Sequence, residues 1–418
     1  MSTARKGTTL RALRHRNFQL FFGGQLISLT GTWMQNVAQA WLVYRLTGSS
    51  ALLGAVSFAS QIPIFLFSPL GGLAADRFPR RNVVIATQAT SMLLAGILAV
   101  LTLSNQIQIW QLFVLAALLG IVNAFDIPAR QSFFIEMVGR DDLINAIALN
   151  SSMFNGARIV GPAIAGILVA QIGEGWCFTL NAVSYVAVIA GLLMMRLEPW
   201  NPTPHTVSAW ESIREGFVYT ARTGPIRTLL LLLGMVSLAG LPYTVLMPIF
   251  ADKILHEGAR GLGLLMGATG FGALVGALII AARTDVKGFG RWVAIGCIVF
   301  SLALAAFAYS TDLYISLALL MVTGFAMMIQ LGASNTLVQS MVPEHFRGRV
   351  MSVYSMLFMG MGPAGAILAG IAADRIGTPE TIAIGAALSL LCGIAYALYL
   401  PKMRPEMRAL IQARKDTN

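Results

Sequence analysis

Long apolar segments, separated by short charged or turn-forming breaks, make up almost the whole chain. Each is at least about as long as an α-helix needs to be to cross the hydrocarbon layer of a bilayer. The breaks define twelve such segments, at residues 18–44, 50–74, 82–104, 110–136, 144–171, 176–195, 228–250, 260–282, 292–310, 313–341, 350–372 and 380–400. The pattern therefore predicts an all-α integral membrane protein with twelve transmembrane helices.

One longer interruption divides these helices into two sets of six. It holds three prolines, Pro199, Pro202 and Pro204, and then an amphipathic stretch at 210–219. We predict a first six-helix bundle at 1–195, a cytoplasmic linker with an amphipathic helix at 196–227, a second bundle at 228–400 and a cytoplasmic tail at 401–418. Six plus six helices with internal similarity is typical of transporters whose site lies near mid-membrane between the halves. Chance similarity between apolar segments is the alternative.

Composition and charge support a membrane protein. Hydrophobic residues are 56% of the chain and charged residues 11%, far from the averages of soluble proteins. All but five of the 29 Lys and Arg residues fall on one side when the helices are counted alternately; the others are Arg45, Lys253, Arg260, Arg375 and Arg158. This asymmetry places both termini in the cytoplasm and explains the net charge of +11 without nucleic acid as a partner.

The three cysteines, Cys177, Cys297 and Cys392, lie in separate apolar segments. This isolation argues against disulfides and against a metal site. We expect neither a metal nor a cofactor.

Polar residues form a stripe along the first predicted helix. They recur at intervals of three or four, which places them on one face: Gln25, Ser28, Thr32, Gln35, Asn36 and Gln39. The tenth helix has a similar stripe, with Gln330, Ser334, Asn335 and Gln339. Hydrogen bonding to neighbouring helices is one explanation. We favour a water-filled cavity faced by both stripes, and we place Asn155 of the fifth helix among its lining residues.

Charges inside apolar segments are confined to residues 126–166. An ionised group in hydrocarbon is costly unless it is paired or hydrated, so Asp126, Arg130 and Arg158 are candidate functional residues. With a turn at 139–142, Asp126 and Arg158 lie about 20 and 24 Å from it along antiparallel helices. We predict an ion pair between them, for which Arg130 competes, and a role in proton coupling. A purely structural pair is the alternative.

The break between the second and third helices resembles the loop signature of the major facilitator superfamily. The resemblance is carried by Gly72, Asp76, Arg77, Arg80 and Arg81. Pro79 stands where that family usually has glycine. The resemblance implies an ion-pair latch that differs between conformations. The alternative is that these arginines only set the topology.

A second resemblance lies in the fifth helix, where Gly156, Gly161, Pro162 and Gly166 are similar to the proline-containing motif of proton-antiporting exporters in that superfamily. A proline without a backbone donor, set among glycines, implies a bent and closely packed helix. Further matches, among them 16–18 and 342–350, extend over nearly the whole chain. Together they resemble the group of bacterial facilitators that includes the enterobactin exporter and drug efflux proteins.

The resemblance implies a function. We expect a monomeric secondary transporter in the bacterial inner membrane that exports a small amphipathic molecule, a drug or a siderophore, by alternating access. The proton gradient would supply the energy, and the partners would be the substrate and the lipid bilayer. A proton-independent facilitator or an importer of a small metabolite is the alternative. A membrane-embedded enzyme is disfavoured because no nucleophile and base are grouped in the sequence.

Overall fold

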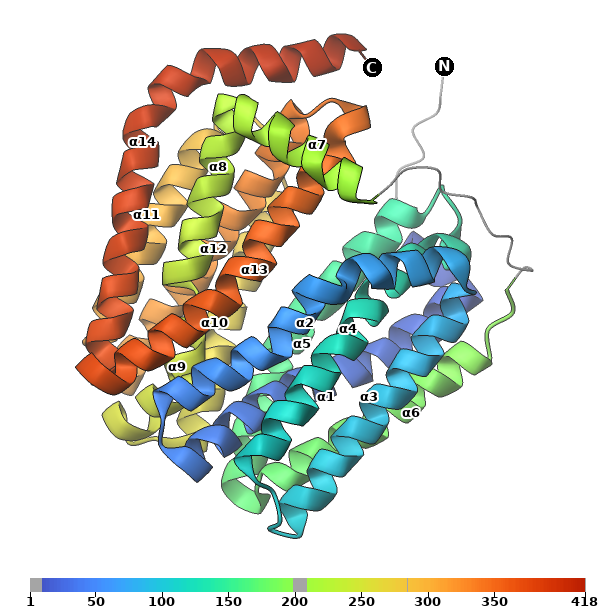
Figure 1. The fold of residues 1–418 in the computed structure, drawn as a ribbon, viewed down its shortest axis with the longest axis vertical. Helices are drawn as coiled ribbons and strands as arrows, with labels where there is room; N and C mark the ends of the chain where they lie inside the picture. The colour runs from blue at the N-terminus through green and yellow to red at the C-terminus, as the bar shows by residue number, and fades with distance from the viewer. Residues whose placement is uncertain (1–9, 198–208, 284, 418) are drawn as a thin grey trace. The chain divides into compact units, whose positions relative to one another are not determined.

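The computed structural model describes residues 10–197, 209–283 and 285–417, and every regular element in these ranges is helical (Figure 1). Eleven helical segments in them are long and apolar enough to span a membrane. A further helix of similar length, α1 (Arg16–Thr47), carries the polar stripe. The prediction of an all-α membrane fold is confirmed.

The first compact unit contains the described residues of 1–39 and 63–205. Besides most of α1 and the second half of α2 (Ser50–Arg77), it comprises a 3-10 turn (Arg11–Arg14), α3 (Arg80–Leu103), α4 (Ile109–Val138), α5 (Leu143–Ile172) and α6 (Glu174–Leu193). Helices α4 and α5 each end at a glycine with positive φ, Gly139 at 73° and Gly173 at 88°. Glycine adopts this conformation at little cost, so the chain can reverse after each helix.

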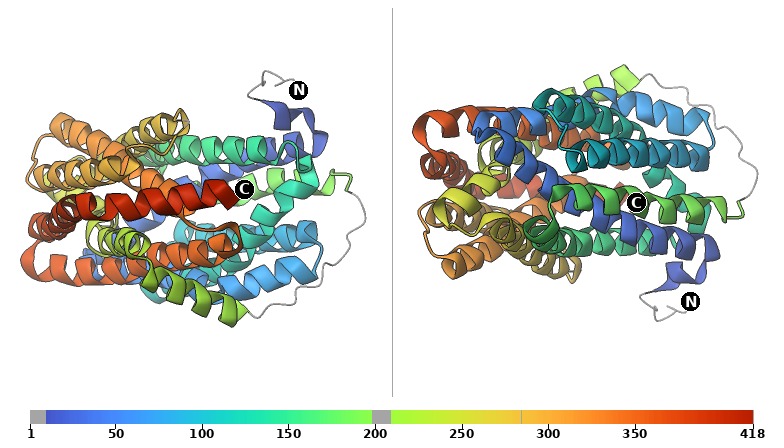
Figure 2. Two further views of the ribbon diagram at one scale, coloured as in Figure 1. Left: turned by 90° about the horizontal axis from the view of Figure 1, so that it is seen from above. Right: turned by 90° about the horizontal axis from the view of Figure 1, so that it is seen from below.

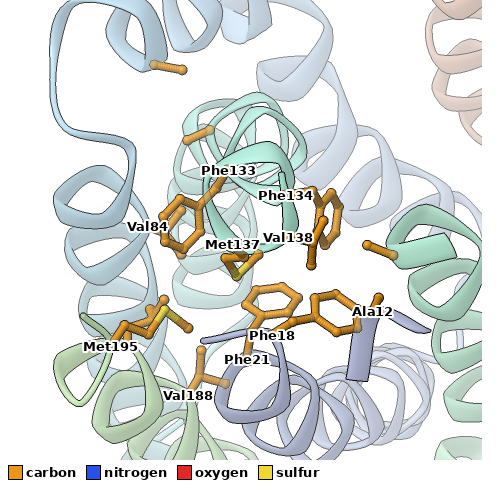
Figure 3. Close-up of a cluster of buried hydrophobic side chains, with 14 residues drawn as sticks. Ala12, Phe18, Phe21, Val84, Phe133, Phe134, Met137, Val138, Val188 and Met195 are labelled. Carbon is orange, nitrogen blue, oxygen red and sulfur yellow. The ribbon is translucent and has the colours of Figure 1, made fainter. Parts of the chain in front are cut away.

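A buried hydrophobic cluster joins the six helices α1 to α6 of the first unit (Figure 3). It includes Phe18 and Phe21 of α1, Phe133 and Phe134 of α4, and Val188 of α6. The rings of Phe21 and Phe134 meet edge to face, with centroids 5.5 Å apart. The cluster holds α4 against α1 within two turns of Asp126 and Arg130, and it thereby positions the polar residues described below.

The second compact unit contains the described residues of 40–62 and 206–418. Its helices are α7 (Ala209–Arg222), α8 (Gly224–Met235), α9 (Tyr243–Ile249), α10 (Gly258–Ala281), α11 (Phe289–Ala308), α12 (Leu313–Met341), α13 (Glu344–Ile376) and α14 (Thr378–Thr417). Two π-helical turns, Val236–Gly240 and Phe250–Ile254, make the seventh span continuous from Gly224 to Ile254. Helix α7 covers the amphipathic stretch at 210–219.

Residues 40–62 belong to the second unit, whereas the sequence analysis assigned them to the first bundle. The Asp374 carboxylate of α13 accepts hydrogen bonds from the backbone N–H of Ser50 (2.7 Å) and of Ala51 (3.1 Å), at the start of α2. It also accepts one from the Ser49 hydroxyl, at 2.8 Å. A carboxylate at a helix N-terminus satisfies donors that have no partner within the helix. This cap ties the beginning of α2 to α13.

Helix α14 extends well beyond its apolar part. Pro401 and Pro405 lie inside it, and proline removes a backbone hydrogen bond and bends a helix. Figures 1 and 2 show the last part of α14 turning and running crosswise over the end of the second unit. The segment predicted as a tail is thus helical, and it packs on the unit through Met403 and Met407, which are 3% and 6% exposed.

Candidate polar site in the first unit

A small polar cavity of about 110 Å³ lies inside the first unit, between α1, α3, α4 and α6. Its lining residues are Gln25, Ser28, Leu29, Thr32, Gln35, Asn36, Gln88, Ser91, Leu119, Asn123, Asp126, Arg130, Asn181 and Tyr185. Most are polar, and they occupy the middle of apolar helices. Polar groups at this depth require partners, because lipid supplies none. The cavity is the candidate functional site.

Helix α1 contributes its polar stripe to the wall. Gln25, Thr32, Gln35 and Asn36 all line the cavity, which spacings of three and four residues predict. Gln35 also accepts a hydrogen bond from the Asn181 side chain of α6, at 2.7 Å. The polar stripe of α1 therefore does two things: it lines a small cavity within the first unit, and it forms a hydrogen bond to the neighbouring helix α6.

Asp126 is the charged centre of the site. Its side chain is buried, with 3% exposed, and it accepts three hydrogen bonds, each 2.9 Å long. Thr87 and Gln88 of α3 donate to Oδ1, and Arg130 Nε donates to Oδ2 from one turn further along α4. A buried carboxylate is tolerated when a cation and several donors surround it. The arrangement surrounds Asp126 with one cation and two neutral donors at the cavity wall.

Two further oxygens of the wall are unsatisfied by the chain. Gln25 Oε1 and Gln88 Oε1 are both buried and have no hydrogen-bond donor within the described residues. Buried polar atoms nearly always find a partner in a protein or in water. Both residues line the cavity, but neither oxygen is itself accessible to solvent. The chain thus leaves the hydrogen-bonding capacity of two acceptors beside the cavity unused.

The predicted ion pair between Asp126 and Arg158 is wrong. Asp126 pairs with Arg130, while the Arg158 guanidinium lies over the Trp33 ring of α1, 5.7 Å from its centroid. Counting residues from the turn gives the depth of a side chain but not the direction in which it points. Asp126 faces α3, whereas Arg158 faces α1, where a cation–π contact is favourable.

Asn155 and Gln39 were also predicted to line a cavity, but neither is among the lining residues. Asn155 is 8% exposed and donates to the Ser151 carbonyl oxygen, one turn back in α5, at 2.9 Å. Such a local bond satisfies a polar side chain without any cavity. Gln39 is half-buried and is the last residue of α1 that belongs to the first unit.

The predicted lining residues of α12 are buried in the second unit. Gln330 and Ser334 are 0% and 1% exposed, and neither side chain has a hydrogen-bond partner among the described residues. Asn335 is half-buried and accepts a hydrogen bond from Gln339, at 2.5 Å. That the stripes of α1 and α12 face one cavity stays a prediction.

The predicted latch residues lie around the start of α3. Arg80 forms an ion pair with Glu136 of α4, at 2.7 Å, and Arg81 donates to the Leu193 carbonyl oxygen of α6, at 3.1 Å. Asp76 is half-buried near the end of α2, and Arg77 is the last residue of that helix. A switch between conformations at these residues stays a prediction.

The glycine of closest approach in this motif is Gly71 rather than Gly72. A Cβ atom at Gly71 would overlap the backbone carbonyl of Ala124 in α4, whereas one at Gly72 would meet nothing within 4 Å. Successive helical residues point about 100° apart, so only one of the two glycines can face α4. The sequence shows both glycines but not which of them faces the neighbouring helix.

The glycines of α5 also differ from one another. A Cβ at Gly161 would lie 2.5 Å from Trp33 Cβ and 2.9 Å from the Thr30 carbonyl oxygen of α1. At Gly156 it would meet nothing within 4 Å. Gly166 and Pro162 are buried, and α5 continues as a helix through the proline. Gly161 is thus the residue that permits the close contact between α1 and α5.

Several site residues lie outside the predicted set. Thr87, Gln88 and Ser91 lie on one face of α3, and Asn181 and Tyr185 are one turn apart on α6. Spacings of three and four residues mark them, as they mark the stripe of α1. Glu136, the partner of Arg80, was also missed, because it lies in the last turn of α4, 56 residues further along the chain.

Known proteins resemble this chain over almost its whole length. The sequence profile of the transmembrane secretion effector family, a branch of the major facilitator superfamily, matches residues 7–415. The multidrug efflux pump Tap of Mycobacterium tuberculosis (strain ATCC 25618 / H37Rv) is 30% identical over 396 residues, which cover 91% of this chain and 92% of Tap. The enterobactin exporter EntS of Shigella boydii serotype 4 is 23% identical, over 93% of each chain.

Solved structures give the same fold. A transporter of the POT family, crystallised with 5-aminolevulinic acid, superposes with a TM-score of 0.75 over 93% of this chain and 97% of its own, at 11% identity. The resemblance inferred from the loop signature and the proline motif is confirmed by these matches. With eleven candidate membrane spans in the described residues and a family match over residues 7–415, this chain belongs to the transmembrane secretion effector family of major facilitator transporters.

Proposed function

We propose that this transporter exports a small amphipathic molecule, a drug or a siderophore, across the bacterial inner membrane in exchange for protons. The observation that carries the proposal is the buried Asp126 carboxylate at the wall of a polar cavity. Proton exchange needs a titratable group that the substrate path can reach, and Asp126 is the acid among the cavity-lining residues. The relatives Tap and EntS, named as a multidrug efflux pump and an enterobactin exporter, support export.

The coupling step would take place at the pair of Asp126 and Arg130. Protonation of the carboxylate removes its negative charge, so the attraction to the guanidinium of Arg130 is lost. Arg130 then turns towards other acceptors, and Thr87 and Gln88 lose an ionised partner. A substrate that brings a cationic or hydrogen-bond-donating group to the Asp126 carboxylate would favour the opposite, ionised state. Proton and substrate would thus bind to alternative states of one cavity, which is the condition for antiport.

The orientation follows from charge. Lys and Arg residues gather at one end of the predicted helices, and cytoplasmic connections carry such an excess. We place both termini and the latch around Arg80 in the cytoplasm. Protons would then enter from the periplasmic side while substrate leaves.

Accumulation in everted membrane vesicles tests this proposal. Ethidium serves as the drug probe and enterobactin as the siderophore probe, each with and without an imposed pH gradient that is acidic inside. Uptake that requires both the gradient and the protein is the expected result. Uptake that is equal with and without the gradient would indicate a facilitator. Accumulation only in right-side-out vesicles would indicate import, and either result would contradict the proposal.

A further inference from the structure

A pocket with a strongly basic lining lies at the end of the second unit. Five cationic side chains line it: Lys287, Arg291, Arg404, Arg408 and Arg414. The one acid among the described lining residues is Asp285. The volume of this C-terminal basic pocket is about 1280 Å³, which is large enough for a ligand of considerable size. An excess of four positive charges in one concavity attracts an anion.

The last part of α14 forms one wall of this pocket. Beyond Leu400 the helix packs on the unit through Met403 and Met407, as described above, and this leaves Arg404 and Arg408 at the pocket. Arg414 anchors the far end, where its Nη1 donates to the Gln339 carbonyl oxygen of α12 at 2.7 Å. The Nε of the same guanidinium is buried and has no acceptor among the described residues. The chain therefore fixes the guanidinium in place but leaves one donor to be satisfied.

The other walls are apolar and continue into the membrane-spanning helices. Leu337 lies near the end of α12, Leu400 lies in α14 where the apolar part ends, and Ile411 faces them from the crosswise segment. Next to the pocket, Trp292 at the start of α11 carries the Arg283 guanidinium over its ring, 4.4 Å from the centroid. Tryptophan and arginine at helix ends are typical of the level of lipid headgroups. The pocket thus combines cations at headgroup depth with apolar walls that reach towards the acyl region.

We infer that this pocket binds the headgroup of an anionic phospholipid. The phosphate would lie among the guanidinium groups of Arg404, Arg408 and Arg414. The first carbons of the acyl chains would follow Leu337 and Leu400. Free phosphate would use the same cations but would leave the apolar walls without a partner. A bound lipid would fasten the end of α14 to α11 and α12. This inference needs only that the chain spans a membrane, and it does not depend on proton coupling or on the cargo.

Lipid retention measures the inference directly. The full-length protein is purified in detergent, exchanged into nanodiscs of phosphatidylcholine with a minor share of phosphatidylglycerol or cardiolipin, and examined by native mass spectrometry. The variants are Arg408→Gln, Arg408→Lys and Lys402→Gln. Lys402 is the matched control, because it is exposed on the same segment but does not line the pocket. Arg408 is exposed as well, so its replacement is not expected to unfold the protein. Thermal unfolding of each variant checks this.

Retention of the anionic lipid should fall about fivefold in Arg408→Gln, which corresponds to the loss of one cation near an anionic headgroup. Arg408→Lys and Lys402→Gln should stay close to the wild type, and phosphatidylcholine should not be retained. Equal loss in Lys402→Gln would overturn the inference in favour of general surface charge. No loss in Arg408→Gln would also overturn it. In a parallel arm, inorganic phosphate is added: displacement of the lipid at low millimolar phosphate would assign the pocket to free phosphate instead.

Discussion

Arg130 donates a hydrogen bond from Nε to Oδ2 of Asp126 over 2.9 Å, and both residues lie on α4, one helical turn apart. An ion pair within one helix keeps its geometry when neighbouring helices move. Its electrostatic balance can therefore change only through protonation, through the α3 donors or through a bound ligand. This makes the pair a suitable sensor of proton and substrate in the cavity.

Replacement of Arg130 tests how strongly the pair is coupled. Arg130→Met leaves a buried carboxylate with two neutral donors, which should lower the stability of the protein by about 3 kcal/mol at neutral pH. Arg130→Lys keeps the charge and should cost less. The double variant Asp126→Asn, Arg130→Met should lose less than the sum of the two single losses, because no charge is left unpaired. Chemical unfolding in detergent measures the stabilities. Strictly additive losses would show that the two groups do not interact.

Gly71 and Gly72 provide a matched pair of substitutions in α2. Gly71→Ala places a methyl group against the Ala124 carbonyl and should destabilise the protein by about 1–3 kcal/mol. Gly72→Ala meets open space and should be neutral or slightly stabilising, since alanine favours helices by roughly 1 kcal/mol. Thermal unfolding of the two purified variants distinguishes them. A larger loss in Gly72→Ala would mean that the other face of α2 packs on α4.

Gly161 and Gly156 make the same comparison in α5. Gly161→Ala should separate α5 from Trp33 and disturb the ring on which Arg158 lies. Gly156→Ala should have little effect, because a Cβ there has no neighbour within 4 Å. The change can be followed by tryptophan fluorescence in a background in which the other tryptophans are replaced, so that the signal comes from Trp33. An unchanged Trp33 signal in Gly161→Ala would contradict the close packing of α1 and α5.

The connection between α4 and α5 predicts a pH effect. Asp142 accepts a hydrogen bond from His15 (2.9 Å) and pairs with Arg11 (3.1 Å), and these contacts, chiefly the bond to His15, hold the pKa of Asp142 below its ordinary value. Because the pKa of Asp142 is lower in the folded state, its ionised carboxylate stabilises the fold at pH values above its ordinary pKa of about 4. This stabilisation is lost as the pH falls through the lower pKa of the folded state.

The wild type should therefore be more thermally stable than Asp142→Asn at pH 6, and this difference should become smaller below about pH 4. Asp141→Asn is the control, since Asp141 is the exposed neighbour in the same turn. A difference that stays constant through this range would show that the carboxylate of Asp142 is not what stabilises the turn.

Sequence patterns predicted the helices and the polar face of α1, because helical period and apolar length are local properties. Spacings of three and four residues define such a face. The partners of Asp126 could not be assigned from depth alone, because depth leaves the direction of a side chain open. Arg158 accordingly lies on Trp33. For a similar reason the sequence could not show which of Gly71 and Gly72 packs closely, since this depends on which face of α2 contacts α4.

The central claim is that Asp126 exchanges its proton for substrate, and proton release on substrate binding measures this exchange. The purified protein in weakly buffered detergent solution, with a soluble pH indicator, is mixed with whichever of ethidium or enterobactin it accumulates in vesicles. Asp141→Asn, the same chemical change on an exposed loop residue, serves as the control. The account predicts that the wild type and Asp141→Asn release protons on binding, whereas Asp126→Asn binds without releasing any. Proton release from Asp126→Asn equal to that of the wild type would contradict it.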